Sequence, residues 1–417
     1  MARLVHITPR YWPARGGLET VFEKLCEHFA ADGHDVEVWT TDALTVRGLT
    51  RSGEPRAMAE HETLRGVRIR RFPARRWPGM RMLRTLAHLA PAGRHWHANT
   101  LRWTPWVPSL DRACAAETKP VDVVHAAGLP YSSLLLAGER LARRTRARWL
   151  VSPFTHVAAP GRAGRLMRRA YLSPFNVALL SGADVVLAQT DAERDELVTS
   201  GIDAARVRLL GLGVDRARVV GGDRAGQRTR WGMDAETVVV GHLANKSRDK
   251  GTIDLLEAMP AVWSRQPHVR VVLAGTTMPS YTAHLSRHPL DSRVIDCGTL
   301  TDAEHRDFMA AIDVFALPSY VESFGLAALE AAAAGAAVIA YAHGGPASIW
   351  QDDVDARLVP PGDIGVLGAT LAEVCGDAVM RRRLAAAGGA LAAGFTWDRV
   401  LAQAGQAYGL DQGRVAS

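Results

Sequence analysis

Two glutamates, Glu322 and Glu330, have the type and spacing in this chain that point most directly to chemistry. Glu322 follows the strand-like apolar run 314–317, and Glu330 lies about two turns into a run of strong helix formers that begins at Leu326. Backbone amides at such a helix start attract phosphate. A nucleotide-sugar, with phosphates in its middle and diols at both ends, suits this stretch. The alternative is two solvent-facing acids on an alanine-rich helix.

A second cluster of charge lies in the loop 244–252. Lysine occurs only four times in this arginine-rich chain, and Lys246 and Lys250 both lie in this loop, ahead of an expected helix. An ammonium group beside a helix N-terminus suits a pyrophosphate, whose negative charge grows as a glycosyl bond breaks. A solvated turn is the alternative.

The elements that must position these residues alternate between strand and helix. The order strand 4–7, a glycine turn at Gly16 and Gly17, helix 18–29 and strand 36–40 is a βαβ unit, which implies a parallel sheet. A second series of strands and helices begins near residue 237. We therefore expect an α/β protein with two Rossmann-like domains that face a cleft, over residues 1–215 and 216–395.

His156 ends an expected strand that starts at Trp149. Because ligands of open α/β sheets bind beyond the carboxyl ends of strands, His156 is a candidate site residue. A capping or packing histidine is the alternative. The paired glycines Gly16 and Gly17 lack the full G-x-G-x-x-G pattern, which disfavours a dinucleotide site.

The formal net charge of +7 is unevenly distributed. Residues 64–110 contain no Asp or Glu, and four tryptophans are interleaved among ten arginines there. This composition favours contact with an anionic membrane surface or a lipid-linked acceptor, while a solvated loop, a surface that binds an anionic acceptor and nucleic-acid binding remain alternatives. No nucleic-acid motif accompanies the segment, so we predict no nucleic-acid partner. The candidate contacts are Arg70, Arg71, Arg75, Arg76 and Trp77.

Other classes of site are disfavoured. The four cysteines are scattered, which argues against disulfides and structural zinc. Asp353 and Asp355 have D-x-D spacing but lie in a turn, so we predict neither a metal nor another cofactor. No run suits a signal peptide or a membrane span, so we expect a cytoplasmic protein, peripheral at the inner face of the membrane if the arginine segment binds lipid.

The whole chain resembles the retaining glycosyltransferases of family four, which have the two-domain GT-B fold. Their paired-glutamate motif E-x7-E is intact as Glu322 and Glu330. Other matching segments occur in family order: Gly16-Gly17, His156, Gly213-Val214-Asp215, Lys250-Gly251, Gly344-Gly345, Pro360-Pro361-Gly362-Asp363 and Phe395-Thr396-Trp397.

The resemblance implies roles for individual residues. Glu322 would contact the donor sugar, Glu330 the ribose hydroxyls, and His156 would lie near the anomeric centre. The last helix, at about 396–417, would pack back on the first domain. Family enzymes are thought to react on the front face without a covalent nucleophile, so charge stabilisation and positioning would be the chemistry. The implied pyrophosphate and donor contacts are Gly16, Gly17, Lys250, Ser323, Phe324, Gly325 and Leu326.

Two positions depart from the family pattern. Gly241-His242 stands where the family has Gly-Arg, and Lys246 is our candidate substitute for that phosphate-binding arginine. Ser348 stands where a glutamate usually follows the paired glycines.

We therefore expect transfer of a sugar from a UDP- or GDP-linked donor to a hydroxyl acceptor, with retention and without a metal. The acceptor would be lipid-linked, or a cell-envelope or natural-product glycoside. Two other classes remain as alternatives, namely a nucleotide-sugar 2-epimerase of the same fold and a non-catalytic nucleotide-sugar binder.

Overall fold

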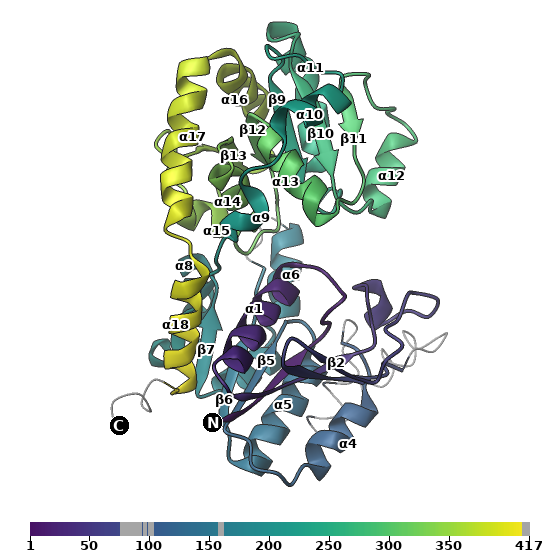
Figure 1. Cartoon of the computed structure of the whole chain (residues 1–417), viewed down its shortest axis with the longest axis vertical. Coiled ribbons are helices and arrows are strands. Elements are labelled where there is room, and N and C mark those ends of the chain that lie inside the picture. Colours follow the sequence, from purple (N-terminus) through teal and green to yellow (C-terminus); the bar gives the residue numbers. More distant parts are fainter. Residues whose placement is uncertain (76–93, 95–97, 99–103, 157–161, 411–417) are drawn as a thin grey trace. The chain divides into compact units, whose positions relative to one another are not determined.

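The computed structural model describes residues 1–75, 94, 98, 104–156 and 162–410. These residues divide into two compact units (Figure 1). The first unit comprises Met1–Thr155, Leu166–Gly211 and Val400–Ser417, and the second comprises His156–Arg165 and Leu212–Arg399. Each unit has its own sheet, mostly parallel in the first and wholly parallel in the second, so the predicted α/β fold is confirmed.

The first unit is built on a sheet of eight strands within its described part, in the order β3-β4-β2-β1-β5-β6-β7-β8. All neighbouring pairs are parallel except β3 and β4. Its central strands are buried, as expected where helices cover both faces of a parallel sheet. The strands are β1 (Arg3–Thr8), β2 (Asp35–Thr41), β3 (His61–Leu64), β4 (Val67–Phe72), β5 (Val123–Ala127), β6 (Arg148–Ser152), β7 (Val185–Ala188) and β8 (Val207–Leu209).

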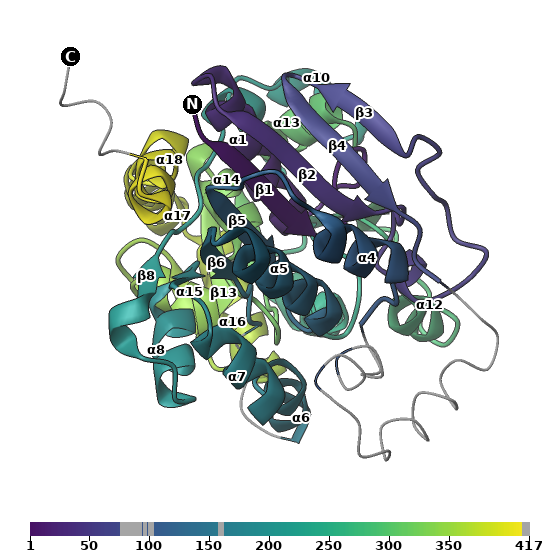
Figure 2. The same ribbon diagram turned by 90° about the horizontal axis from the view of Figure 1, so that it is seen from below.

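Helices lie on both faces of this sheet, with α4 and α5 together on one of them (Figure 2). The last helix of the chain, α18 (Trp397–Tyr408), places Tyr408 in the first unit, where its ring stacks on Phe29 and its hydroxyl lies 2.7 Å from His125 Nδ1. The other helices are α1 (Gly17–Ala31), α4 (Pro108–Ala116), α5 (Ser132–Thr145), α6 (Arg162–Tyr171), α7 (Pro174–Ser181) and α8 (Asp191–Thr199), with short 3₁₀ turns at Arg47–Leu49 and Ala204–Arg206.

The second unit has a six-stranded sheet in the order β11-β10-β9-β12-β13-β14, in which all neighbouring pairs are parallel. This is the strand order of a Rossmann fold. The order reverses between β9 and β12, and the carboxyl ends of strands at such a point are where open α/β sheets bind ligands. The strands are β9 (Val239–Leu243), β10 (Arg270–Ala274), β11 (Val294–Asp296), β12 (Val314–Leu317), β13 (Ala337–Tyr341) and β14 (Arg357–Val359).

The helices of the second unit alternate with these strands. Their buried side chains join the apolar strands in one core, which includes Met259, Val271 and Leu371. The helices are α9 (Arg216–Val219), α10 (Arg224–Arg230), α11 (Thr252–Arg265), α12 (Pro279–Leu285), α13 (Asp302–Ala311), α14 (Leu326–Ala333), α15 (Gly344–Ile349), α16 (Ile364–Gly376) and α17 (Ala378–Ala393).

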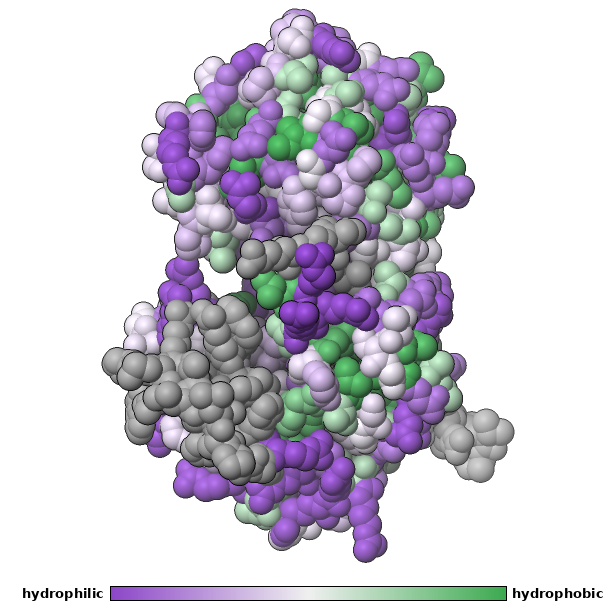
Figure 3. Space-filling model, turned by 180° about the vertical axis from the view of Figure 1, so that it is seen from behind, coloured by the Kyte–Doolittle hydropathy of each residue, from purple (hydrophilic) through white to green (hydrophobic). Residues whose placement is uncertain are grey.

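Within the described residues, none of the helices is both long enough and apolar enough to span a bilayer. On the face drawn in Figure 3, hydrophilic and hydrophobic side chains are interspersed in both units.

Candidate functional site

The site residues of the second unit lie in the two loops that follow β9 and β12. Tyr320 N–H donates to Asp249 O at 2.9 Å and so joins these loops. Gly251 makes the close approach possible, because it has a φ of 68° and a Cβ there would meet Pro318 O at 1.7 Å. The glycine after Lys250 is therefore required by the fold.

Lys250 and Glu322 meet across these loops. Lys250 Nζ donates to Glu322 Oε2 at 2.9 Å and to Val321 O at 2.8 Å. Glu322 Oε1 accepts from Gly325 N–H at 3.1 Å. Both side chains keep some exposure, 25% for Lys250 and 17% for Glu322, so the pair is positioned but not sealed from a ligand. The sequence predicted both residues but not their direct contact.

His156 lies in the same unit beside this pair. Its Nδ1 is 2.7 Å from Ser323 Oγ, which joins two predicted site residues. Burial, with a further contribution from the Lys250 charge, lowers the pKa of His156 to about 4. Burial alone would raise the pKa of Glu322, but Lys250 and the other neighbours lower it below its ordinary value. At neutral pH the site therefore holds a neutral imidazole and a carboxylate beside Lys250.

Helix α14 begins beside Glu322. Its N-cap Gly325 has a φ of 89°, a conformation that favours glycine. Ala328 N–H donates to Gly325 O at 2.9 Å, and the amides of Leu326 and Ala327 lie at the helix start, where amides have no acceptor inside their own helix. Phe324 is buried and packs edge to face on Phe395, which fixes the turn. Gly345 packs so closely that a Cβ there would meet Ser323 O at 2.4 Å. The predicted donor contacts at Phe324, Gly325 and Leu326 therefore lie on a rigid turn.

Glu330 has a neighbour that the sequence did not indicate. Its Oε2 lies 3.4 Å from His305 Nε2, and both side chains are mostly buried. The imidazole of His305, from α13, thus flanks the carboxylate predicted to bind ribose.

Lys246, the candidate substitute for the family's arginine, is buried. Its side chain is 1% exposed, it forms an ion pair with Asp296, and its ammonium lies 5.3 Å from the centre of the Tyr281 ring. Reaching a phosphate would break that buried ion pair, so we assign Lys246 a structural role instead of the predicted donor contact.

His242, the departure from the Gly-Arg pattern, is fully buried. Its Nδ1 lies 2.9 Å from Ala316 O and its Nε2 lies 2.9 Å from Thr252 Oγ1. Because a carbonyl only accepts, Nδ1 carries the proton, and Nε2 accepts from the threonine hydroxyl. His242 therefore connects β9 to β12 and to the start of α11.

His343 was missed by the sequence argument. Its Nε2 donates to Ser319 O at 2.9 Å, while Nδ1 is buried and has no hydrogen-bond partner among the described residues. Its position two residues after β13 and directly before Gly344 was the available signal. Ser348, the second departure from the family pattern, donates to Gly345 O at 2.9 Å.

Gly16 and Gly17 lie in the first unit, at the start of α1. Glu19, in the first turn of α1, is buried and forms an ion pair with Arg10 at 2.7 Å. A Cβ on Gly16 would meet Glu19 Oε2 at 2.3 Å, whereas a Cβ on Gly17 would meet nothing within 4 Å. A side chain at 16 would therefore displace the Glu19 carboxylate from its place beside Arg10, whereas one at 17 has open space.

The arginine segment is partly structural. Val67 and Ile69 are buried in β4, and Arg68 between them pairs with Asp35 and Glu37. Arg71, a predicted ligand contact, has protein partners of its own. Its side chain is 3% exposed and it donates to Glu62, Trp12 O and Ala59 O, so it holds neighbouring loops together.

Arg70 and Arg75 differ from Arg71 because no salt bridge joins either to a carboxylate in the described part of the chain. Arg76 and Trp77 lie outside the described residues. Within those residues, there is also no group of three His, Cys, Asp or Glu side chains placed to hold a metal ion.

Comparison with known sequences identifies two domains. Residues 16–213 match a glycosyl transferase 4-like domain, and residues 235–377 match the family of glycosyl transferases group 1. D-inositol 3-phosphate glycosyltransferase of Kineococcus radiotolerans is 29% identical over 94% of this chain and 91% of its own. The protein of the same name from Kribbella flavida is 31% identical, over 53% of this chain and 55% of that relative's length.

Solved structures share the fold. Sucrose-phosphate synthase from Thermosynechococcus elongatus has a TM-score of 0.77 at 23% identity, covering 99% of each chain. Anabaena HepE, solved with UDP-glucose, has a TM-score of 0.71 at 19% identity, covering 99% of this chain and 100% of its own. Because these structures share its architecture, the chain has the GT-B fold. Because both of its domains match glycosyltransferase models, the chain is a glycosyltransferase and belongs to glycosyltransferase family four.

Proposed function

We infer that this glycosyltransferase moves a sugar from a nucleoside diphosphate sugar to a hydroxyl acceptor with retention of anomeric configuration. The observation that carries this proposal is the Lys250–Glu322 pair at the carboxyl edge of the second sheet, beside the start of α14. A cation for phosphate, a carboxylate for hydroxyls and free helix-start amides are the groups that a nucleotide-sugar needs.

Lys250 would stabilise the departing diphosphate. As the bond between the anomeric carbon and the phosphate oxygen breaks, negative charge grows on that oxygen, and a preorganised ammonium lowers the energy of this state. The acceptor oxygen forms its bond to the anomeric carbon on the same face, and its proton passes to the departing phosphate oxygen. The described residues would thus act by charge and position, without a metal.

Glu322 and His156 would orient the sugar. The Glu322 carboxylate accepts hydrogen bonds from sugar hydroxyls, and its lowered pKa keeps it ionised at neutral pH. His156, neutral because of its lowered pKa, can exchange hydrogen bonds with a hydroxyl near the anomeric carbon. Glu330 would hold the ribose diol and His305 would flank it.

The donor is proposed to be UDP- or GDP-linked. HepE was solved with UDP-glucose, which supports a uridine nucleotide as the first donor to test. Relatives named for D-inositol 3-phosphate support a phosphorylated polyol among the acceptors to test. Acceptors in a lipid-linked, cell-envelope or natural-product class remain within the same proposal.

The test compares the unmodified protein with Glu322→Ala. We expect the variant to bind UDP or GDP as before but to lose sugar transfer and slow donor hydrolysis. If turnover were unchanged, the site assignment would be wrong. Incubation with donor alone separates the other classes, because a 2-epimerase would release epimerised sugar and a non-catalytic binder would leave the donor intact.

A further inference from the structure

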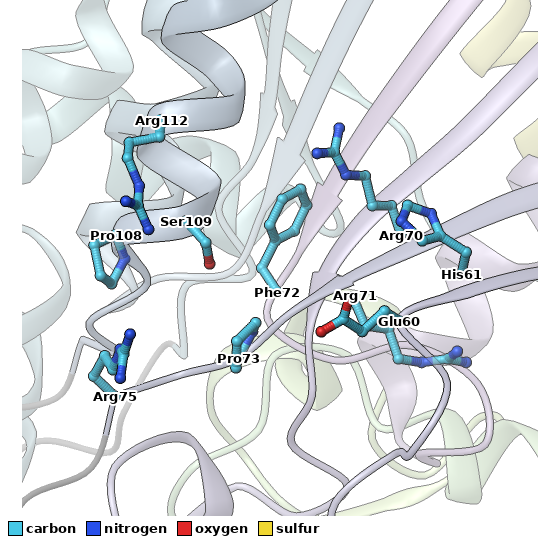
Figure 4. A pocket seen from close by; sticks show the side chains of 10 residues that line it. All are labelled: Glu60, His61, Arg70, Arg71, Phe72, Pro73, Arg75, Pro108, Ser109 and Arg112. Carbon is cyan, nitrogen blue, oxygen red and sulfur yellow. The ribbon is translucent and has the colours of Figure 1, made fainter.

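We propose that a basic pocket on the first unit, between the end of β4 and the start of α4, binds the phosphate group of the acceptor. This inference rests on the proposed function only in identifying the ligand as the acceptor. The pocket itself contains none of the residues assigned to the donor. The pocket has a volume of about 270 Å³ (Figure 4). That is close to the lower end of the roughly 300–1,000 Å³ typical of ligand pockets, so it suits a small head group.

Arginine dominates the walls. Arg75 and Arg112 lie on the α4 side with Pro108 between them, and Arg70 lies across the pocket on the β4 side (Figure 4). Within the described residues no salt bridge joins any of these three arginines to a carboxylate. Guanidinium groups without carboxylate partners are the groups that bind phosphate oxygens in pairs.

The negative charge at the pocket is smaller. Glu60 also lines it, and Arg71 does too, but the Arg71 charge is met by Glu62. The wall therefore carries three arginines without a carboxylate partner against the single carboxylate of Glu60, and an anion is the ligand that this balance favours.

The start of α4 adds a hydroxyl donor and the positive end of the helix dipole. Pro108 and Ser109 of its first turn line the pocket, and Arg112 follows in the next turn. The hydroxyl oxygen of Ser109 is buried and has no hydrogen-bond partner among the described residues. A buried hydroxyl without a partner is costly, and a phosphate oxygen in the pocket would provide one.

A second, larger cavity adjoins the pocket and has room for the part of the ligand that carries the phosphate. It has a volume of about 600 Å³, shares Arg75, Pro108 and Arg112 with the pocket, and adds Trp106 and Asp111. Arg75 and Arg112 thus lie where the two spaces meet, and Trp106 and Asp111 line the larger one. An indole face and a carboxylate suit the ring and hydroxyls of a polyol or sugar.

The pocket also lies at the functional edge of its sheet. Strand β4 runs parallel to β2 and ends at Phe72, and the pocket is lined by Phe72, Pro73 and Arg75, which are the end of β4 and the residues after it. This carboxyl edge is where open α/β sheets bind their ligands. A soluble sugar or polyol phosphate and a phospholipid head group both carry such a phosphate group, and the chemistry that recognises it is the same.

The test uses two charge-matched double variants of the full chain. Arg75→Gln with Arg112→Gln removes two pocket arginines, and Arg51→Gln with Arg140→Gln removes two exposed arginines from elsewhere in the first unit. Isothermal calorimetry measures the binding of glycerol 1-phosphate, UDP and GDP to each protein. Sedimentation measures the binding of each protein to vesicles of phosphatidylglycerol and phosphatidylcholine, and vesicles of pure phosphatidylcholine are the control. A cooperative thermal transition with unchanged circular dichroism shows that every variant is folded, and UDP or GDP binding reports on the second unit.

We expect glycerol 1-phosphate to bind the unmodified protein and the control variant, and to bind the pocket variant at least tenfold more weakly. Loss of vesicle binding in the pocket variant, without binding of the soluble ester, would also support the pocket and identify a lipid head group. The inference fails if neither probe binds the unmodified protein or if the two double variants behave alike. Failure of both UDP and GDP to bind, with phosphate binding intact, would instead overturn the donor proposal alone.

Discussion

Lys250 Nζ lies 2.9 Å from Glu322 Oε2, although 72 positions of sequence separate the two residues. The contact forms because their loops leave neighbouring strands, β9 and β12, at the same edge of the sheet. Lys250→Met should therefore reduce turnover by about 10²–10³-fold, as expected when a preorganised charge is removed from a transition state. Steady-state transfer assays measure this, with Lys250→Arg as the control that keeps the charge. An unchanged kcat in Lys250→Met would contradict the role of Lys250.

The second prediction concerns acid stability. Burial lowers the pKa of His242 to about 4, from an ordinary value near 6.5. Between these values the unfolded chain binds a proton that the folded chain does not, so the free energy of unfolding should fall as pH drops from 6.5 towards 4. Replacing His242 with Gln should reduce this slope by up to about 1.4 kcal/mol per pH unit.

Urea unfolding between pH 4.5 and 7.5 gives that slope. His268→Gln serves as the control, because the side chain of His268 is exposed. Equal slopes for the His242 variant and the unmodified protein would show that His242 does not carry the effect.

The third prediction separates the two reasons why position 251 is a glycine, namely its positive φ and its close packing. Gly251 and Gly232 have almost the same φ, 68° and 67°, but a Cβ on Gly251 would meet Pro318 O at 1.7 Å while one on Gly232 would meet nothing within 4 Å. Gly232→Ala should cost about 1–2 kcal/mol for the backbone conformation alone. Gly251→Ala should cost more and should also reduce turnover, because the Lys250 loop must move. Thermal unfolding and transfer assays test both, and equal effects would remove the argument from close packing.

The fourth prediction concerns Arg71. Because it is buried and bonded to Glu62, Trp12 O and Ala59 O, Arg71→Ser should destabilise the protein by about 2–3 kcal/mol. Arg51→Ser, an exposed arginine, should change the free energy of unfolding by less than about 0.5 kcal/mol. Denaturant titration compares them. A stable Arg71 variant with weakened vesicle binding would restore the ligand role that the structure argues against.

The fifth prediction concerns the last helix. Tyr408→Phe keeps the ring on Phe29 but leaves His125 Nδ1 buried without a partner, which should cost about 1–3 kcal/mol. Tyr408→Ala also leaves a cavity and should cost about 3–5 kcal/mol. Thermal unfolding distinguishes the two variants, and equal losses would mean that the hydrogen bond contributes nothing.

Much of the architecture was predictable because the spacing of apolar residues within a short segment indicates whether that segment is a strand or a helix. Runs such as Val123 to Ala127 are buried throughout, and Leu326 begins a helix as its alanine-rich sequence predicts. Strand β4 was missed because arginine obscured its alternation, in which Val67 and Ile69 point inwards and Arg68 points outwards. The sequence shows charge in such a strand but does not show which carboxylates neutralise it.

The site was predictable where a loop follows a strand, and not where partners are distant in sequence. Lys246 and Lys250 occupy one loop, and only the position of Asp296, 50 residues further on, makes the first of them structural. His305 and His343 were missed for the same reason, since their contacts with Glu330 and Ser319 arise from the fold of the sheet.

The return of residues 400–408 to the first unit has a consequence for synthesis of the chain. Residues 212–399, which contain the whole second sheet, leave the ribosome before Tyr408 does. The second unit can therefore finish folding first, although domains made during translation usually fold in order from the N-terminus. Until the last helix emerges, Phe29 and His125 lack their cover, so the unit that is synthesised first is completed last.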